Sequence, residues 1–349
     1  MAALDAVVVP SISPWDLLGL ELHFLEAVAA HRTAPVLILY SLPGRAVSLG
    51  RYHLYSGAAE RDGILALRRI TGGRAVGSGE GWIGLALVLP NRTALLPERD
   101  ANLKPDQVMN RYARGLLAGL RSLGVECFYP GRDAITRERR EIAMCTFETD
   151  AAGAMLLEAT IAVNRGMEEM VHDLDRLDPN GNITSAVYGP ETSTKLVREL
   201  NRDASFDEIT RAIIGGYAEE LGGVNERGLA AEEWAQAAQR GKALQSIHWL
   251  RRAAEASEFN RSGRIAAQLG QIEARLSVSA ENRIERAMLC GDFIANSPGV
   301  AELEAKLEGR AHDLIAVSNA VTSTYAGGNN FILGSGDLSN LVRLIAGAQ

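Results

Sequence analysis

The chain has 349 residues, 47% of them hydrophobic and 23% charged, which is the composition of a globular protein long enough for two domains. Its formal net charge of −7 argues against nucleic acid or a membrane surface as a partner. No apolar run approaches the roughly 20 residues that span a bilayer, and the N-terminus lacks the basic segment of a signal peptide, so we expect a cytoplasmic location.

Hydrophobic periodicity predicts alternating helices and strands along most of the chain. In chain order these are a helix at 15–32, strands at 34–42, 46–53 and 82–90, a helix at 105–124, strands at 125–129, 140–149 and 154–164, and helices at 167–177, 206–221 and 230–255. Pro105 suits the first turn of its helix and Gly124 suits the end. The alternation predicts a mixed α/β fold.

The pattern changes in the last part of the chain. Residues 270–293 predict two strands about an "AEN" turn, and helices follow from Pro298 onward. We therefore expect a small α+β module at 256–349. The helical segment before it, taken as 226–255, is predicted to be a connector from a larger domain at 1–225.

A glycine-rich segment, "RRITGGRAVGSGEG" at 68–81, separates two of the predicted apolar strands and is called the glycine loop below. Bare backbone N–H groups beside arginines suit the binding of an anion. The segment lacks the GKS or GKT of a P-loop, and a strand follows where a dinucleotide fingerprint needs a helix. From the residues alone, a ligand-binding loop and a flexible hairpin connection both remain open.

At this loop, "RRITGGRAV" resembles the "RRxSGGGAV" signature of lipoate–protein ligases, within the biotin/lipoate ligase and octanoyltransferase superfamily. Further segments resemble motifs of that family in the same order. They are "AVSLGRYH" (46–53, "AVxxGRxQ"), "GVECFYPGRDAIT" (124–136, "GRNDI"), "REIAMCTFE" (140–148, "KISGSAxR"), "EATIAVN" (158–164, "HGTLLxD") and 271–293, similar to the C-terminal accessory domain with its "GDF" motif. The resemblance covers nearly the whole chain.

The resemblance implies a catalytic domain built on a mixed sheet flanked by helices, with an accessory domain at the C-terminus. It implies ATP with Mg and lipoate as the reactants of an active enzyme, and a lipoyl-domain-type protein as the acceptor of the acyl group. It also implies the ligand-binding residues, which are carried over from the matching motifs. These are Arg69, Thr71, Gly72, Gly73, Arg74, Ala75, Val76, Arg132, Asp133, Ala143 and Thr160. No metal-binding residues are expected.

Five positions depart from the family's pattern. Arg74 stands at the third glycine of the signature, where it either contacts phosphate or fills the pocket. The family's lysine falls on Glu141, whose carboxylate would repel the reacting carboxylate and phosphate instead of neutralising them. Met144 replaces a glycine and crowds the site, and the "HG" pair falls on Glu158 and Ala159.

The three cysteines lack CxxC spacing, which argues against a disulfide scaffold and a zinc site. Related octanoyltransferases carry the acyl group as a thioester on cysteine, and Cys127 lies near the place where one branch has that nucleophile. A reactive thiolate needs a cationic neighbour, for which Arg132 is the candidate. The alternative is an ordinary buried cysteine, and Cys145 is expected to be a packing residue.

Two functional hypotheses follow. In the first, the protein is a diverged lipoate–protein ligase or acyltransferase, with Glu141 acting as a base for the incoming amine or Cys127 as the nucleophile. In the second, it is a catalytically inactive relative that binds an acyl ligand or a lipoyl-type partner in assembly or sensing. The joint departures at Arg74, Glu141 and Met144 favour a pocket that has been refilled.

Overall fold

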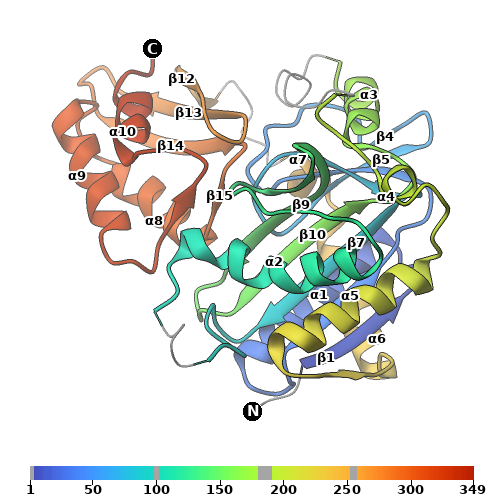
Figure 1. Cartoon of the computed structure of the whole chain (residues 1–349). Coiled ribbons are helices and arrows are strands. Elements are labelled where there is room, and N and C mark those ends of the chain that lie inside the picture. The colour runs from blue at the N-terminus through green and yellow to red at the C-terminus, as the bar shows by residue number, and fades with distance from the viewer. Residues whose placement is uncertain (1–3, 98–101, 180–190, 252–257) are drawn as a thin grey trace.

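The structure is a computed structural model that describes residues 4–97, 102–179, 191–251 and 258–349. A seven-stranded sheet in the order β11-β1-β2-β7-β10-β9-β8 forms the centre of the first domain (Figure 1). Its strands are β1 Leu4–Val9, β2 Val36–Tyr40, β7 Trp82–Leu89, β8 Ala134–Arg137, β9 Arg140–Thr149, β10 Met155–Ala162 and β11 Val224–Glu226. Strand β1 runs parallel to both of its neighbours, and the pairs from β2 to β8 are antiparallel.

A second, four-stranded sheet in the order β4-β5-β3-β6 packs against the first. It consists of β3 Arg45–Leu49, β4 Glu60–Arg61, β5 Ile64–Arg68 and β6 Val76–Gly79. Val47 and Val76 of this sheet share a buried cluster with Met144 and Ala162 of the larger sheet. The first half of the glycine loop, residues 69–75, connects β5 to β6 within this sheet, and Thr71 in the loop contacts Glu158 on β10 of the larger sheet.

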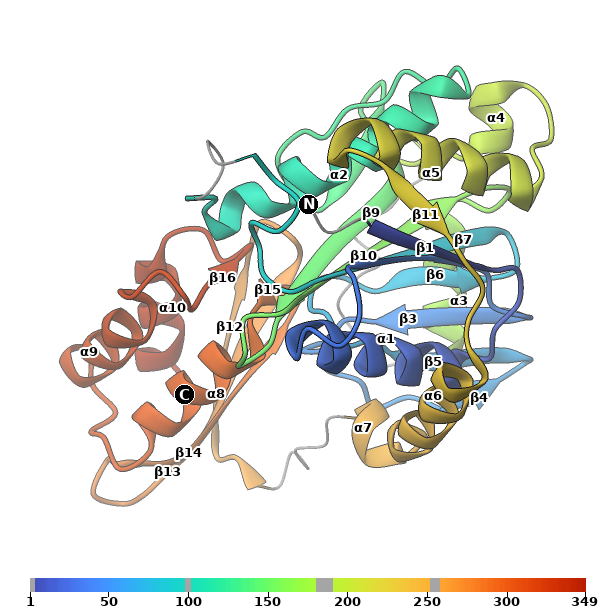
Figure 2. The ribbon, with the colours of Figure 1, turned by 90° about the horizontal axis from the view of Figure 1, so that it is seen from below.

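Helices cover both faces of the larger sheet. The helices are α1 Pro14–Ala29, α2 Pro105–Ser122, α3 Met167–Leu177, α4 Leu196–Leu200, α5 Phe206–Leu221, α6 Ala231–Leu244 and α7 Ile247–Arg251. Figure 2 shows α2 and α5 on one side of the sheet and α1 on the other, with α6 outside α1. Helix α1 begins at Pro14, where the Ser13 hydroxyl accepts a hydrogen bond from the amide of Asp16 at 3.1 Å.

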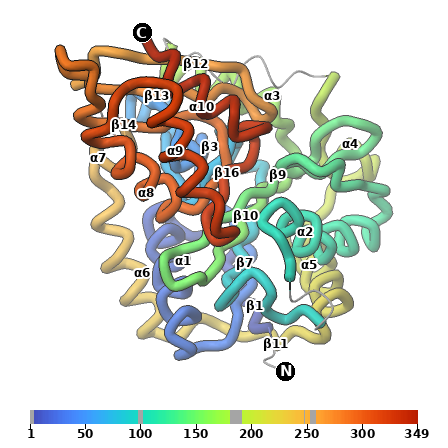
Figure 3. The backbone as a smooth tube through the Cα atoms, turned by 90° about the vertical axis from the view of Figure 1, so that its left-hand side faces the viewer, coloured from blue at the N-terminus to red at the C-terminus, as the bar shows by residue number. Residues whose placement is uncertain are grey.

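The C-terminal part of the chain forms a domain with its own hydrophobic core. It contains β12 Arg261–Ala266, β13 Gln271–Val278, β14 Ile284–Gly291, β15 Ile294–Ala295, α8 Ser297–Leu307, α9 Leu314–Tyr325, β16 Ile332–Leu333 and α10 Leu338–Ala346. Strands β12 to β14 form an antiparallel sheet that the helices cover. Figure 3 shows this domain at the end of the molecule opposite the N-terminus.

The predicted α/β class is confirmed, and the helices predicted at 167–177 and 206–221 coincide with α3 and α5. The strand predicted at 125–129 is wrong, because only Phe128 pairs, with Thr136, in an isolated bridge. The Arg121 guanidinium donates to the carbonyl of Cys127 at 2.7 and 3.1 Å and holds this segment as a loop beside α2.

The predicted single helix at 230–255 is interrupted after Leu244, where α6 ends, and α7 begins at Ile247. Residues 252–257 lie outside the described part of the chain. The predicted domain limit at 225 falls inside β11, and α6 packs along α1 of the first domain. Within the described residues, no helix is both long and apolar enough to cross a membrane.

The two domains meet through aromatic and polar contacts. Tyr52 stacks on Phe293 with ring centroids 4.4 Å apart, and the amide of Gly291 donates to the carbonyl of Tyr52 at 2.7 Å. The amide of Ser297, in the first turn of α8, donates to the carboxyl of Glu148 at 2.6 Å. Glu148 is 2% exposed, and its burial raises its pKa from 4.5 to about 7.

We expect the replacement Glu148→Gln to stabilise the protein at pH 8 and to have little effect near pH 4.5. The amide side chain still accepts from Ser297, but it has no charge to bury. Because the folded state binds the Glu148 proton more tightly than the unfolded chain does, wild-type stability falls as the pH rises from about 4.5 through about 7. Thermal unfolding at both pH values measures the difference.

The exposed residue Glu80 supplies the control, since Glu80→Gln changes a carboxyl that is not buried and should change the melting temperature little. A Glu148→Gln variant whose stability relative to wild type is independent of pH would show that this carboxyl is not the buried titrating group.

Candidate active site

The guanidinium of Arg69 holds the first half of the glycine loop together. Its side chain is buried and donates to the backbone carbonyls of Ser48 at 3.0 Å and Arg74 at 2.7 Å. It also donates to the carbonyl of Gly72 and to the hydroxyl of Thr71. The Arg69 cation is therefore used to fix the backbone of the loop from within.

Thr71 faces Glu158 on β10. The Thr71 amide donates to Oε2 of Glu158 at 3.2 Å, and the Thr71 hydroxyl donates to the same oxygen. On β9, the hydroxyl of Thr146 donates to the carbonyl of Gly72 at 3.0 Å. The loop is thus bound to two neighbouring strands of the larger sheet.

The tip of the loop contacts the C-terminal domain. The amide of Gly73 donates to the carbonyl of Phe293 at 2.7 Å, and Gly73 has a φ of +89°, which favours glycine. A Cβ atom on Gly72 would lie 2.4 Å from the same Phe293 oxygen, so a side chain does not fit there. The two glycines therefore permit a close approach between domains.

Arg74 lies between two carboxylates of the β8–β9 region. Its Nε and one terminal nitrogen bind the two oxygens of Asp133 at 2.7 and 2.9 Å, which is a bidentate pair. The same terminal nitrogen contacts both oxygens of Glu141 at 3.1 and 3.2 Å. Arg74 and Asp133 are almost fully buried, whereas the side chain of Glu141 is 19% exposed. We call these three residues the Arg74 cluster.

Glu141 is fixed by its backbone as well as by Arg74. Its amide donates to the carbonyl of Thr192 at 2.7 Å, and its carbonyl accepts from the amide of Thr194 at 2.8 Å. Burial raises the pKa of Glu141 and the nearby Asp133 carboxylate raises it further, while Arg74 lowers it.

The sequence matches the family described as "Lipoyl protein ligase A/B catalytic domain" over residues 13–218, more than half of the chain. This protein belongs to that family. A curated relative, the octanoyltransferase LipM of an Exiguobacterium species, is 25% identical over 239 residues, which cover 59% of this chain and 82% of the relative.

Solved structures share the fold. LipL1 of P. falciparum, in complex with lipoate, aligns over 99% of both chains with a TM-score of 0.72 and 14% identity. A lipoate-protein ligase A bound with ATP covers 72% of this chain with a TM-score of 0.55 and 17% identity. The lipoate protein ligase-like protein Ta0514 of T. acidophilum, with bound lipoic acid, has a TM-score of 0.53 at 18% identity. The predicted resemblance and fold class are confirmed.

The structure brings together most of the ligand-binding residues predicted for this lipoyl ligase-family protein. Arg69, Thr71, Gly72 and Gly73 form the loop. Arg74 and Asp133 belong to the Arg74 cluster, and Arg132 lies exposed beside it. Ala75 and Val76 are buried in the cluster between the two sheets. Ala143 packs in the core on the α2 and α5 side of the sheet, away from the loop.

A narrow cavity lies behind the loop. It is lined by Leu17, Leu18, Tyr40, Leu42, Ser48, Leu67, Arg69, Ser78, Met144, Thr146, Glu158, Ala159 and Thr160. Its free volume of ≈ 10 Å³ is about what one water molecule requires. Met144, at the position of a family glycine, is 1% exposed and occupies space at this cavity.

A pair of carboxyl groups is buried beside the cavity. Glu21 of α1 is fully buried, and neither of its oxygens has a hydrogen-bond partner within the described residues. Burial raises its pKa well above the usual value, and the neighbouring Glu158 carboxyl raises it further. The pKa of Glu158 is also raised by burial, but Arg69 and the hydrogen bonds from Thr71 lower it, whereas Glu21 has no hydrogen bond of this kind among the described residues.

Cys127 lies apart from the loop, in the core on the α2 and α5 side. It is fully buried, and burial raises its pKa to about 11 although Arg121 lowers it. Cys145 is also fully buried, with a pKa raised to about 12. The predicted cationic neighbour of Cys127 was Arg132, whereas the structure places Arg121 against its carbonyl.

The residues at this place do not fit an acyl-adenylate in the manner that the resemblance implies. The predicted phosphate donors are engaged with protein groups: Thr71 with Glu158, Gly73 with Phe293, and Arg74 with Asp133 and Glu141. Asp133 and Glu141 also place two carboxyl groups against Arg74. Among the described residues, no group of three or more His, Cys, Asp and Glu side chains could hold a metal ion.

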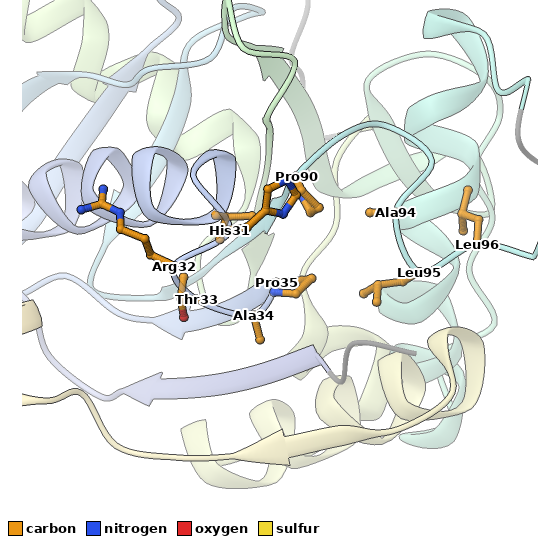
Figure 4. Close-up of a pocket in the computed structure, with 10 residues that line it drawn as sticks. His31, Arg32, Thr33, Ala34, Pro35, Pro90, Ala94, Leu95 and Leu96 are labelled. Atoms are coloured by element: carbon orange, nitrogen blue, oxygen red, sulfur yellow. The ribbon is translucent and has the colours of Figure 1, made fainter.

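A separate pocket, of about 550 Å³, lies on the surface at the C-terminal end of α1 and shares no residue with the loop or the Arg74 cluster (Figure 4). Its labelled lining residues include Pro35 and Pro90 on one side and Leu95 on the other. His31 and Arg32 are its titratable groups. The pocket offers no arrangement for acyl transfer.

The sequence interpretation missed two residues of the site. Glu21 stands within the apolar face of α1, between Leu17 and Leu25, and a charged residue on such a face is a detectable signal. Phe293 belongs to the "GDF" segment, but its carbonyl contact with Gly73 joins residues that are far apart in sequence. No local sequence pattern in either segment predicts that contact.

We expect Arg74→Ala to destabilise the protein by about 3–5 kcal/mol, because it leaves the buried Asp133 carboxylate without its cation. Adding Asp133→Asn in the same chain should restore part of the loss by removing the uncompensated charge. Urea denaturation gives both free energies. Arg202→Ala, which breaks an exposed ion pair with Glu208, is the control and should change little. A small effect of Arg74→Ala alone would contradict the buried cluster.

We expect Gly72→Ala to weaken the contact between the domains, since its Cβ would lie 2.4 Å from the Phe293 carbonyl oxygen. Overpacking of this kind costs about 1–3 kcal/mol. Denaturation measures the loss, and small-angle scattering measures the separation of the domains. Gly215→Ala in α5 is the matched control, because a Cβ there meets nothing within 4 Å. Equal stability of the two variants would contradict the close approach.

Proposed function

We propose that this protein does not activate an acyl group itself, and that it acts as a lipoyl ligase-family subunit that binds a lipoyl-domain-type partner. The observation that carries the proposal is the Arg74 cluster. Arg74 and Glu141 replace a glycine and a lysine of the family's motifs, and they bind one another at 3.1 Å. The cation that an acyl-adenylate requires is absent at position 141, and Arg74 is neutralised by Asp133.

Two further features support the proposal. The amide of Gly73 is bonded to the C-terminal domain, so this donor takes part in the domain contact. The cavity behind the loop, at ≈ 10 Å³, has no room for an octanoyl or lipoyl chain as it stands. Support for the partner comes from a relative of the same fold, a bi-partite lipoate protein ligase of T. acidophilum described with its E2 lipoyl domain.

A second candidate function is acyl transfer through Cys127. It is favoured by the similarity to the octanoyltransferase LipM and by the place of Cys127 before the "GRDA" segment. The buried thiol, with its raised pKa, would first have to be exposed and deprotonated. Incubation with an octanoyl thioester, followed by mass spectrometry of the intact protein, tests it. An octanoyl adduct that Cys127→Ser abolishes would establish this function.

For the proposed function, we expect no lipoyl adduct when the protein is mixed with ATP, Mg, lipoate and a lipoyl domain, while a competent ligase modifies the same domain. Calorimetry should nevertheless detect binding of the lipoyl domain. Glu141→Lys alone should change little, because Arg74 and Met144 still occupy the site. Binding of lipoate or ATP should require Arg74→Gly, Glu141→Lys and Met144→Gly together, in a non-additive manner.

An adduct formed by the wild-type protein would overturn the proposal. Nucleotide or lipoate binding that appears with Glu141→Lys alone would show that the site lost only its charge and was not refilled.

A further inference from the structure

An open pocket lies over the exposed side of the Arg74 cluster. It has a volume of about 540 Å³, which is in the range of small-molecule sites. It is lined by Arg74, Pro130, Arg132, Asp133, Ala134, Thr136, Arg139, Glu141, Thr192 and Gln268. Most of these come from the β8–β9 hairpin and the loop before it, and Gln268 comes from the C-terminal domain. We call it the hairpin pocket.

The floor of the hairpin pocket carries a net negative charge. One guanidinium, that of Arg74, faces two carboxylates. Asp133 takes the bidentate contact and is 1% exposed, whereas Glu141 shares a nitrogen already bound to Asp133 and remains partly exposed toward the pocket. Glu141 is therefore the floor group that a ligand can reach, and it calls for a cationic partner.

The rim of the hairpin pocket carries positive charge. Arg137 and Arg140, on the same hairpin, form ion pairs with Glu138 and Glu199 and do not line the pocket. Arg132 and Arg139 do line it, are exposed, and form no ion pair within the described residues. Among the described residues, the two hairpin arginines without a direct ion pair are thus the two that line the pocket, and the charge of Arg132 lowers the pKa of Glu141 across it.

The backbone of the hairpin supports a role for Arg139. Glu138 and Arg139 form the two-residue turn between β8 and β9, with φ values of +49° and +67°. Asparagine and glycine adopt this turn readily, whereas long side chains do so at a cost in free energy. The turn sets Arg139 at the rim in a conformation that its residue type does not favour.

We propose that the hairpin pocket binds a small zwitterion, with a primary ammonium group against Glu141 and a carboxylate group between Arg132 and Arg139. A simple anion is attracted by the rim but repelled by Glu141, and a simple amine meets the opposite problem. A molecule that carries both groups satisfies both ends. This inference concerns a different ligand from the lipoyl domain of the proposed function and does not depend on it.

The test compares 6-aminohexanoate with hexanoate and hexylamine by calorimetry on the full chain. We expect 6-aminohexanoate to bind at least tenfold more tightly than either single-charge analogue. A series of ω-amino acids of increasing length should show an optimum, because only one range of lengths spans from Glu141 to the two arginines of the rim. Such a pair of charges occurs both in a free amino acid and in neighbouring side chains of a protein. A blocked peptide with a lysine beside an aspartate represents the protein chain, and free L-lysine represents the amino acid. Their relative affinities distinguish these two kinds of ligand.

Variants locate the binding. Glu141→Gln should lower the affinity for 6-aminohexanoate at least tenfold and leave or improve that for hexanoate. Arg132→Ala with Arg139→Ala should reverse the preference toward hexylamine. These two arginines are exposed, so their replacement tests the site even if Glu141→Gln fails to fold. Glu138→Gln and Arg137→Ala, on the same hairpin but outside the pocket, are the matched controls and should leave the affinities unchanged.

Equal affinities for the three probes, loss of binding in the controls, or no binding of 6-aminohexanoate at millimolar concentration would each overturn the proposal. Because none of these measurements uses ATP or a lipoyl domain, a failure here is separate from a failure of the proposed function.

Discussion

The guanidinium of Arg74 connects the two sheets of the first domain. The backbone of Arg74 belongs to the glycine loop, where its carbonyl accepts a hydrogen bond from Arg69. The Arg74 side chain binds the β8–β9 region through Asp133 and Glu141. The position of the loop, the closed cavity behind it and the open pocket in front of it all depend on this contact. A buried guanidinium is retained only with such partners, because its desolvation costs more than a single exposed ion pair returns.

The departures from the family's motifs are coupled through space. A glycine and a lysine at these positions would leave one positive charge for a ligand, whereas Arg74 and Glu141 neutralise one another. Met144 and Glu158 lie on adjacent strands behind the loop, where one fills space and the other binds Thr71. In this protein the residues at these positions therefore bind one another and fill the space behind the loop.

The sequence predicts helices and strands correctly where apolar spacing and capping residues determine them. Helices α3 and α5 were predicted because their apolar spacing is regular, and α5 also has a serine cap at its start and a glycine at its end. The segment at 125–129 has a strand-like composition, but the Arg121 contact with the Cys127 carbonyl overrides it. At the site, both fates of Arg74 were open, because its pairing with Glu141 joins residues 67 positions apart. No local pattern could select that partner, or place Phe293 on Gly73.

The carboxyl of Glu21 has no hydrogen-bond partner within the described residues, and its burial makes the stability of this domain depend on pH. Burial raises the pKa of this carboxyl well above its usual value, and the neighbouring Glu158 carboxyl raises it further. The folded domain therefore binds a proton at this group more tightly than the unfolded chain does. The stability of the domain should accordingly fall as the pH rises above the usual range of a carboxyl group, and the heat of folding should vary with the ionisation enthalpy of the buffer.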